Sequence, residues 1–484
     1  YRNNGNGTFT DVSAEAGIRN QTFGLSAAVI DVNNDGYPDI FVANDFIEPD
    51  MLYVNNGNGT FTEAFAEYFR HTSHNSMGSD AADFNNDGLE DLIVLDMLPE
   101  DNKRQKLLAT SMVLERYNTL VQYGYQHQLM RNVLQLNNGN GSFSDIGELA
   151  GVAKTDWSWA ALFADFDNDG WKDIFIGNGI KHDMTNMDYL DFKTDSLQKA
   201  AAAGRPLITE QNYLDWINFM PSNKLRNYLY RNTHDLRFAD VSEAWGLTEK
   251  LFSNGAAYAD LDNDGDLDLV LNNLDDAAVV YENKSNELRS HNYLKIKFEG
   301  PAPNRFGVGA AARVYAQGQM QAHQLKVARG FLSSMPMELH FGLGEAKQAD
   351  SIRIFWPDGR RELLQNILAN QTLTAAYANA RPGRWTEPAA AAPIFEALAN
   401  SIDFQHIEDN FNDFKREPLL PHQMSRLGPF LATGDVNGDG LDDCYIGGGG
   451  GQAGVFFVQQ TERAWRALGF GENLPRGDTR PLFL

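Results

Sequence analysis

The stretch DVNNDGYPD at residues 31–39 recurs, with small changes, at four other places in this chain of 484 residues. The other copies are DFNNDGLED at 83–91, DFDNDGWKD at 165–173, DLDNDGDLD at 260–268 and DVNGDGLDD at 435–443. Every copy has an oxygen-bearing side chain at positions 1, 3, 5 and 9, and glycine at position 6. Calcium binds six to eight oxygen ligands in a turned loop, and glycine permits the turn. The pattern therefore predicts five calcium-binding loops.

These loops are not EF-hands. An EF-hand needs glutamate at position 12 and a helix on each side of the loop. Position 12 is apolar in every copy, where the residues are Val42, Val94, Ile176, Leu271 and Ile446. The run that follows each loop is short and rich in β-branched side chains, which favours a buried strand. Turn formation alone explains Asp, Asn and Gly in one copy, but it does not explain a carboxylate at position 9 in all five.

A second repeated element accompanies the loops. It reads YRNNGNGTFTDV from Tyr1, LYVNNGNGTFTEA from Leu52, LQLNNGNGSFSDI from Leu134 and LYRNTHDLRFADV from Leu229. The Asn-Gly steps predict hairpin turns, and the fourth copy lacks them, so we expect its turn to be less regular. One unit is then strand, calcium loop, strand, strand, turn and strand. A repeated four-stranded antiparallel blade of this kind predicts a β-propeller.

Uneven spacing between the loops marks insertions and a further domain. Residues 99–131 and 181–227 have apolar residues at helical spacing and are expected to be mainly helical. Residues 290–378 lack the loop motif and alternate as strands do, for example in YLKIKFEG, AARVYAQG, QLKVARG, SIRIFWPDG and QTLTAAY. The predicted domains are a propeller at 1–289, a β domain at 290–378, a linker at 379–393 and the start of a second propeller at 394–484. The first and last residues of the sequence both lie within repeats, which predicts that the chain is a fragment of a longer protein.

Composition excludes several classes of function. The net charge is −25, so binding to nucleic acid through phosphate contacts is not expected. Five bound calcium ions would change this charge to −15, that is −25 + 10. The chain has one cysteine, Cys444, and no apolar run of the ~18 residues that a membrane helix needs.

The blades resemble the integrin-type repeats called FG-GAP or VCBS repeats. Residues 290–378 resemble the ASPIC/UnbV domain in the segments NRFGVGA from Asn304, RGFLSS from Arg329, LHFGLG from Leu339 and FWPDG from Phe355. The order of domains is similar to that of Bacteroidota-type surface proteins. This resemblance implies an all-β dominated fold, a calcium-bound propeller with helical insertions, and a location outside the cell or on the bacterial cell surface. It implies no settled molecular activity.

The resemblance also assigns the calcium ligands, with side chains at positions 1, 3, 5 and 9 and the backbone carbonyl at position 7. By loop these are Asp31, Asn33, Asp35, Tyr37 and Asp39; Asp83, Asn85, Asp87, Leu89 and Asp91; Asp165, Asp167, Asp169, Trp171 and Asp173; Asp260, Asp262, Asp264, Asp266 and Asp268; and Asp435, Asn437, Asp439, Leu441 and Asp443. The expected role of the five ions is structural, because they neutralise carboxylates that otherwise oppose loop closure.

These features favour a non-catalytic binding module that captures a glycan or a surface protein. Two alternatives remain open: a calcium-dependent enzyme similar to polysaccharide lyases, and a scaffold of a cell-envelope complex. No catalytic residue is predicted, and the oligomeric state is undetermined. Three other sets of residues were considered, and a structural role is favoured for each: Trp157, Trp159 and Trp171 as a sugar-stacking surface; His71 and His74 as metal ligands; and Ser333 and Ser334 with His340 as a nucleophilic site.

Overall fold

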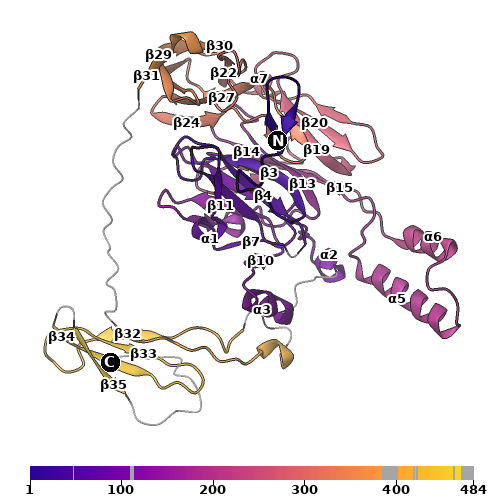
Figure 1. Cartoon of the computed structure of the whole chain (residues 1–484), viewed down its shortest axis with the longest axis vertical. Helices are drawn as coiled ribbons and strands as arrows, with labels where there is room; N and C mark the ends of the chain where they lie inside the picture. The colour runs from indigo at the N-terminus through magenta and orange to yellow at the C-terminus, as the bar shows by residue number, and fades with distance from the viewer. Residues whose placement is uncertain are drawn as a thin grey trace. The chain divides into compact units, whose positions relative to one another are not determined.

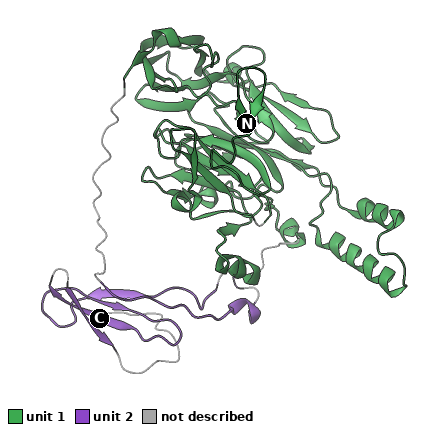
Figure 2. Cartoon of the chain, in the orientation of Figure 1, with its two compact units in different colours: residues 1–385 green, residues 386–484 purple. Residues whose placement is uncertain are grey.

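The computed structural model describes residues 1–46, 48–108, 114–383, 402–417, 420, 423–461 and 464–469. The chain forms two compact units, residues 1–385 and 386–484 (Figure 2). Strands dominate both units (Figure 1), which confirms the expected β-rich fold. The domain boundary predicted near residue 289 falls within the first unit. Most of the predicted linker at 379–393 lies outside the described residues.

Each predicted calcium loop joins the first and second strands of an antiparallel sheet. Four of these sheets have four strands, in the predicted order. Their strands are β3 (Gly24–Ile30), β4 (Asp39–Asn44), β5 (Met51–Asn55) and β6 (Phe61–Glu63); β8 (Ser79–Ala82), β9 (Asp91–Val94), β11 (Val133–Asn137) and β12 (Phe143–Asp145); β13 (Ser158–Ala164), β14 (Asp173–Asn178), β16 (Tyr228–Asn232) and β17 (Phe238–Asp240); and, in the second unit, β32 (Leu431–Gly434), β33 (Asp443–Ile446), β34 (Val455–Thr461) and β35 (Ala464–Gly469).

The sheet of the fourth loop has three strands, so the prediction of four is wrong there. They are β19 (Ser253–Ala259), β20 (Asp268–Asn273) and β21 (Val279–Tyr281). No Asn-Gly step follows β21, and the chain turns instead into the short helix α7 (Ser285–Leu288). Asp266 supports this turn, since its Oδ2 accepts the hydroxyl of Ser285 at 3.1 Å and the N–H of Asn286 at 3.0 Å.

The first strands of the sheets lie side by side in the order β3, β8, β13 and β19. Small residues permit this close approach: a methyl group at Gly78 would lie 1.7 Å from the carbonyl oxygen of Trp159. Large side chains fill the space between sheets, for example Phe84 and Phe163, whose rings stack with centroids 6.0 Å apart. The hydrophobic core of the repeats therefore lies between neighbouring sheets.

The fourth hairpin turn is as regular as the others, so the expectation of an irregular turn is wrong. The N–H of Thr233 donates to the carbonyl of Arg237 at 3.0 Å, as the corresponding groups do in the three Asn-Gly copies. His234 and Leu236 have φ of 68° and 66°, where the other copies have glycine. A residue outside the turn fixes the end of β16, because the N–H of Asn232 donates to Asp173 at 3.0 Å. The turn residues adopt the backbone conformation that this strand end requires.

Helices lie in both insertions, which leave the repeats between the second and third strands of their sheets. They are α2 (Asn102–Leu107), α3 (Leu114–Gln122), α5 (Met187–Ala202) and α6 (Glu210–Phe219). Figure 1 shows α5 and α6 projecting away from the sheets. The smaller elements of the repeats are β1 (Arg2–Asn3) with β2 (Phe9–Thr10), α1 (Phe65–Tyr68), β7 (His71–Ser73) with β10 (His127–Leu129), α4 (Gly147–Ala150), and β15 (Leu225–Arg226) with β18 (Lys250–Leu251).

Residues 292–382 form two sheets around a separate core. One is β27 (Glu338–Gly344), β22 (Asn292–Glu299) and β30 (Gln371–Ala376); the other is β24 (Gln319–Gln324), β23 (Ala311–Ala316), β28 (Gln348–Phe355), β29 (Arg360–Leu368) and β31 (Arg381–Pro382). Single turns of 3₁₀ helix lie at η1 (Tyr377–Asn379) and, in the second unit, at η2 (Asp413–Lys415). None of the helices in the described part of the chain combines the length and apolarity needed to span a bilayer.

The strand predicted at QLKVARG, residues 324–330, is wrong. β24 ends at Gln324, and the following residues form a small hairpin of β25 (Ala328–Arg329) and β26 (Ser333–Ser334). This hairpin lies against β3 and β19 of the repeats. The guanidinium of Arg329 holds it there, since it donates to both carboxylate oxygens of Asp80 on β8, at 2.8 and 2.6 Å.

Candidate metal loops

In each predicted calcium loop, carboxylates accept hydrogen bonds from backbone N–H groups of the same loop. In the first loop Asp31 accepts the N–H groups of Asp35 at 3.1 Å and Gly36 at 2.8 Å. Asp35 in turn accepts the N–H of Tyr37 at 2.8 Å. In all five loops the glycine at position 6 donates to position 1, and position 7 donates to position 5. The side chains at positions 1 and 5 are therefore held on the inside of the loop.

Position 4 of the loop is a requirement that the sequence analysis missed. Its residue has positive φ in every copy, between 55° at Asn34 and 76° at Gly438. Asparagine and glycine are the residues that adopt this conformation most readily. The signal was present, because position 4 is asparagine in four copies and glycine in the fifth.

The aspartate at position 9 has a structural role of its own. It is the first residue of β4, β9, β14, β20 and β33. In the first loop Asp39 is buried, and it accepts the N–H of Val32 at 2.9 Å and the N–H of Asn55 at 2.7 Å. The same pair of bonds occurs in the other four loops. This carboxylate ties the loop to the third strand, which is a second physical reason for its presence in all five copies.

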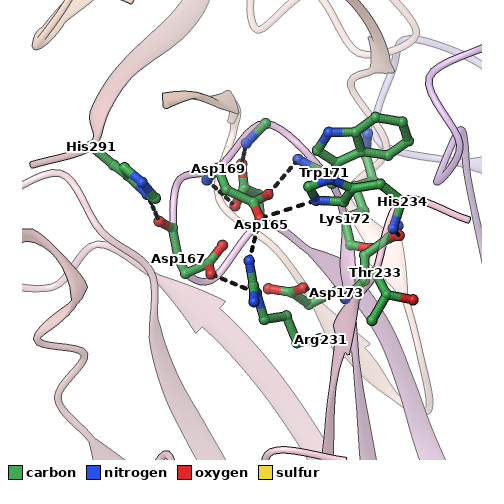
Figure 3. A network of polar contacts seen from close by, with 12 residues as sticks. Asp165, Asp167, Asp169, Trp171, Lys172, Asp173, Arg231, Thr233, His234 and His291 are labelled. Atoms are coloured by element: carbon green, nitrogen blue, oxygen red, sulfur yellow. Dashed lines mark hydrogen bonds and ion pairs between the residues drawn. The ribbon is translucent and has the colours of Figure 1, made fainter. Parts of the chain in front are cut away.

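The third and fourth loops hold compact groups of carboxylates. Oxygens of Asp165, Asp167 and Asp169 lie within 4.8 Å of one another (Figure 3), and so do oxygens of Asp260, Asp262 and Asp264. The Oδ1 atoms of Asp167 and Asp260 are buried and have no hydrogen-bond partner among the described residues. A buried oxygen without a donor fits a bound cation, so the donor set of these loops is suited to calcium.

The other three loops have asparagine at position 3. The side-chain amides of Asn33, Asn85 and Asn437 donate to the carboxylate at position 5, at 2.9, 2.9 and 2.8 Å respectively. In these loops one carboxylate oxygen at position 5 is occupied by an amide. A metal ion would bind after the amide turns its oxygen toward it.

Burial disfavours the ionised form of the loop carboxylates. It raises the pKa of Asp31, Asp39 and Asp83 from 3.8 to about 6. In the third loop burial and neighbouring carboxylates raise the pKa of Asp165 well above 3.8. The exposed fifth loop differs: the N–H of Gly440 donates to Asp435 and lowers its pKa. A divalent cation would favour the ionised form of all these groups.

The three tryptophans considered as a sugar surface do not form one. Trp157 is buried in the core between sheets, and Trp159 packs against Phe331 with ring centroids 4.8 Å apart. Trp171 lies at the third loop, where it stacks on His234 with centroids 4.5 Å apart. Packing, which was favoured for these residues, is confirmed for Trp157 and Trp159.

The histidine and serine candidates do not form a common site, and each makes contacts with different neighbours. The Nε2 atom of His71 lies 2.9 Å from Asp145, while the backbone N–H of His74 donates to Asp96. Ser333 donates to the carbonyl oxygen of Phe331. His340 contacts the side chain of Asn168 through Nε2 at 2.6 Å.

Comparison with known proteins finds two family matches, both within the first unit. The FG-GAP-like repeat matches residues 1–42, 31–94 and 122–176, and the ASPIC and UnbV domain matches residues 300–382. Cartilage acidic protein 1 of Mus musculus is 25% identical over 357 residues, which are 72% of this chain and 44% of the relative. The Homo sapiens protein is 25% identical over 361 residues (72% and 43%), and the Xenopus tropicalis protein is 26% identical over 384 residues (76% and 47%).

The chain spans less than half the length of these curated relatives. A solved structure of an Agrocybe aegerita lectin that recognises non-reducing terminal N-acetylglucosamine aligns over 95% of this chain and 83% of its own, with a TM-score of 0.26 and 13% identity. That alignment is too distant to support an argument. The chain contains FG-GAP-like repeats and an ASPIC and UnbV domain, and it is homologous to cartilage acidic protein 1.

Proposed function

We propose that this chain is part of an extracellular, non-catalytic adhesion module whose repeats form a calcium-stabilised β-propeller. The observation that carries the proposal is the loop geometry. In each loop, N–H groups of the loop's own backbone hold the carboxylates at positions 1 and 5 inward. The buried carboxylates of the first three loops have raised pKa values, and calcium would supply the positive charge that they lack.

In this proposal the ligands are the twenty side chains at positions 1, 3, 5 and 9 and the five carbonyls at position 7. The ions hold the loops in one shape, and the surfaces of the sheets and insertions take up a glycan or a protein. The homology to a protein named for cartilage supports a role outside the cell. Calcium concentrations there are high enough to fill sites of modest affinity.

Thermal unfolding tests the metal part of the proposal. Calcium should raise the melting temperature of the full chain, and a chelator should reverse the rise, because a site filled at a hundred times its Kd adds about 2.7 kcal/mol of stability. Asp31→Asn removes one negative charge and one carboxylate oxygen from the first loop and should reduce the rise. Asp215→Asn, an exposed carboxylate on α6, is the matched control and should leave it unchanged. Identical melting curves with calcium and with chelator would refute a structural role for the metal.

The binding part needs its own experiment. A glycan array and a pull-down of surface proteins, each with calcium present, should yield a ligand that is lost when the chelator is added. Incubation with acidic polysaccharides, monitored for unsaturated products, separates binding from lyase activity. Product formation would refute the non-catalytic assignment.

A further inference from the structure

The third loop differs from the first, second and fifth in the basic side chains around it. Arg231 on β16 places Nε 3.1 Å from Asp167 and Nη2 3.3 Å from Asp169 (Figure 3). Arg289, which follows α7, contacts the same Oδ2 atom of Asp167. Within the described residues, no arginine or lysine forms an ion pair with the side chains at positions 1, 3 and 5 of those three other loops. The fourth loop does have such a pair, between Lys295 and Asp260.

The arginines occupy only part of the carboxylate group. Both of them contact Oδ2 of Asp167, while the Oδ1 atom of this buried residue has no hydrogen-bond partner in the described part of the chain. The oxygens of Asp165 and Asp169 lie close by. About a third of each arginine side chain remains exposed, so each can move into solvent without leaving a buried charge. The third loop thus keeps the donors for a cation and also carries counter-ions that a cation must displace.

We propose that Arg231 and Arg289 substitute for the metal in the third loop, and that this loop fills with calcium later and binds it more weakly than the first and fifth loops do. This inference rests on the calcium binding proposed above. Two positive charges close to the carboxylates oppose the arrival of a divalent ion and compete for Asp167 and Asp169. In the described part of the chain the first and fifth loops have no such ion pair, so they fill first, whereas Lys295 competes in the same way for Asp260 of the fourth loop.

Terbium luminescence can observe the third loop separately. Terbium binds oxygen ligands as calcium does, and energy transfer from a neighbouring indole makes it luminesce. Position 7 is tryptophan in the third loop, whereas it is Tyr37, Leu89, Asp266 and Leu441 in the others. Excitation of tryptophan in the full chain therefore reports this loop most directly, and the part of the signal that Trp171→Phe removes belongs to it. Trp245, whose ring centroid lies 5.4 Å from the guanidinium of Arg289, supplies any remainder. Calorimetric titration of the same protein with calcium reports all loops together.

We expect the tryptophan-excited terbium signal of the wild type to need about tenfold more terbium than the main phase of a calorimetric titration with the same metal. Arg289→Met should lower its midpoint by about tenfold, and Arg231→Met should act in the same direction. Arg289→Lys keeps the charge and should resemble the wild type. Arg205→Met, in the exposed turn between α5 and α6, is the control and should change nothing.

The outcomes separate the two proposals. Circular dichroism checks that each variant is folded. An unchanged midpoint in the folded Arg289→Met and Arg231→Met variants, with calorimetric calcium binding intact, would overturn the role of the arginines and leave the calcium proposal standing. Absence of calorimetric calcium binding in the wild type would overturn the calcium proposal itself.

Discussion

Replacing Asp50 with asparagine should remove a destabilisation that grows as the pH rises. Asp50 lies directly before β5 and is 1% exposed; it accepts the N–H of Asn44 at 2.8 Å and the hydroxyl of Ser76 at 2.9 Å. Asn132 and Asn227 occupy the matching places before β11 and β16, and each likewise accepts a backbone N–H at 2.8 Å. Asp50→Asn therefore introduces a side chain that the fold already holds at two equivalent positions.

The magnitude follows from the pKa. Burial raises the pKa of Asp50 from 3.8 to about 8, and the neighbouring Asp96 carboxylate also raises it. The folded state binds this proton more tightly than the unfolded state, so the stabilisation is complete below about pH 4 and is lost as the pH rises toward 8. The difference of 8 minus 3.8, at about 1.4 kcal/mol per pKa unit, gives an upper limit of roughly 6 kcal/mol.

Urea denaturation followed by tryptophan fluorescence, at about pH 5 and about pH 9, measures this effect. A chelator in every sample keeps the calcium loops in the same state in all proteins. Between the two pH values the free energy of unfolding of Asp50→Asn should fall by several kcal/mol less than that of the wild type. The free energy of unfolding of Asp215→Asn should fall between these pH values by as much as that of the wild type. Equal losses in Asp50→Asn and the wild type would show that Asp50 does not titrate as inferred.

Two further substitutions test the packing of the repeats. Arg329→Met leaves the buried carboxylate of Asp80 without its arginine partner and should lower the free energy of unfolding by about 3–5 kcal/mol. The double mutant with Asp80→Asn should recover much of this loss, and additive effects of the two substitutions would argue against the pairing. Gly78→Ala places a methyl group 1.7 Å from the carbonyl oxygen of Trp159 and should destabilise by about 3 kcal/mol or more. Gly469→Ala, whose methyl group meets no atom of the described residues within 4 Å, should be nearly neutral in thermal unfolding of the same kind. Similar effects at the two glycines would refute the steric argument.

Local sequence patterns predicted the loops and the strands that flank them. Short-range chemistry explains this success: the glycine at position 6 and the carboxylates at positions 1 and 5 make their bonds within nine residues. The β-branched runs after each loop form buried second strands for the same local reason.

Contacts between residues far apart in the sequence could not be predicted in this way. Arg289 contacts Asp167 across 122 positions, and Arg329 contacts Asp80 across 249. Neither arginine stands in a motif that indicates its partner. The regular turn at His234 was missed because its shape is imposed by bonds at the strand ends, whereas turn prediction considers only the turn residues.

The hairpin of β25 and β26 has a consequence for how the molecule is made. Residues 328–334 lie against β3 and β19, so the ribosome must complete more than three hundred residues before the inner strands acquire this last neighbour. During synthesis the carboxylate of Asp80 has no arginine partner until residue 329 has been made. Expression of the FG-GAP-like repeats alone would leave that carboxylate with the N–H of Phe163 but without its arginine, so we expect the repeats to be less stable alone than in the whole first unit.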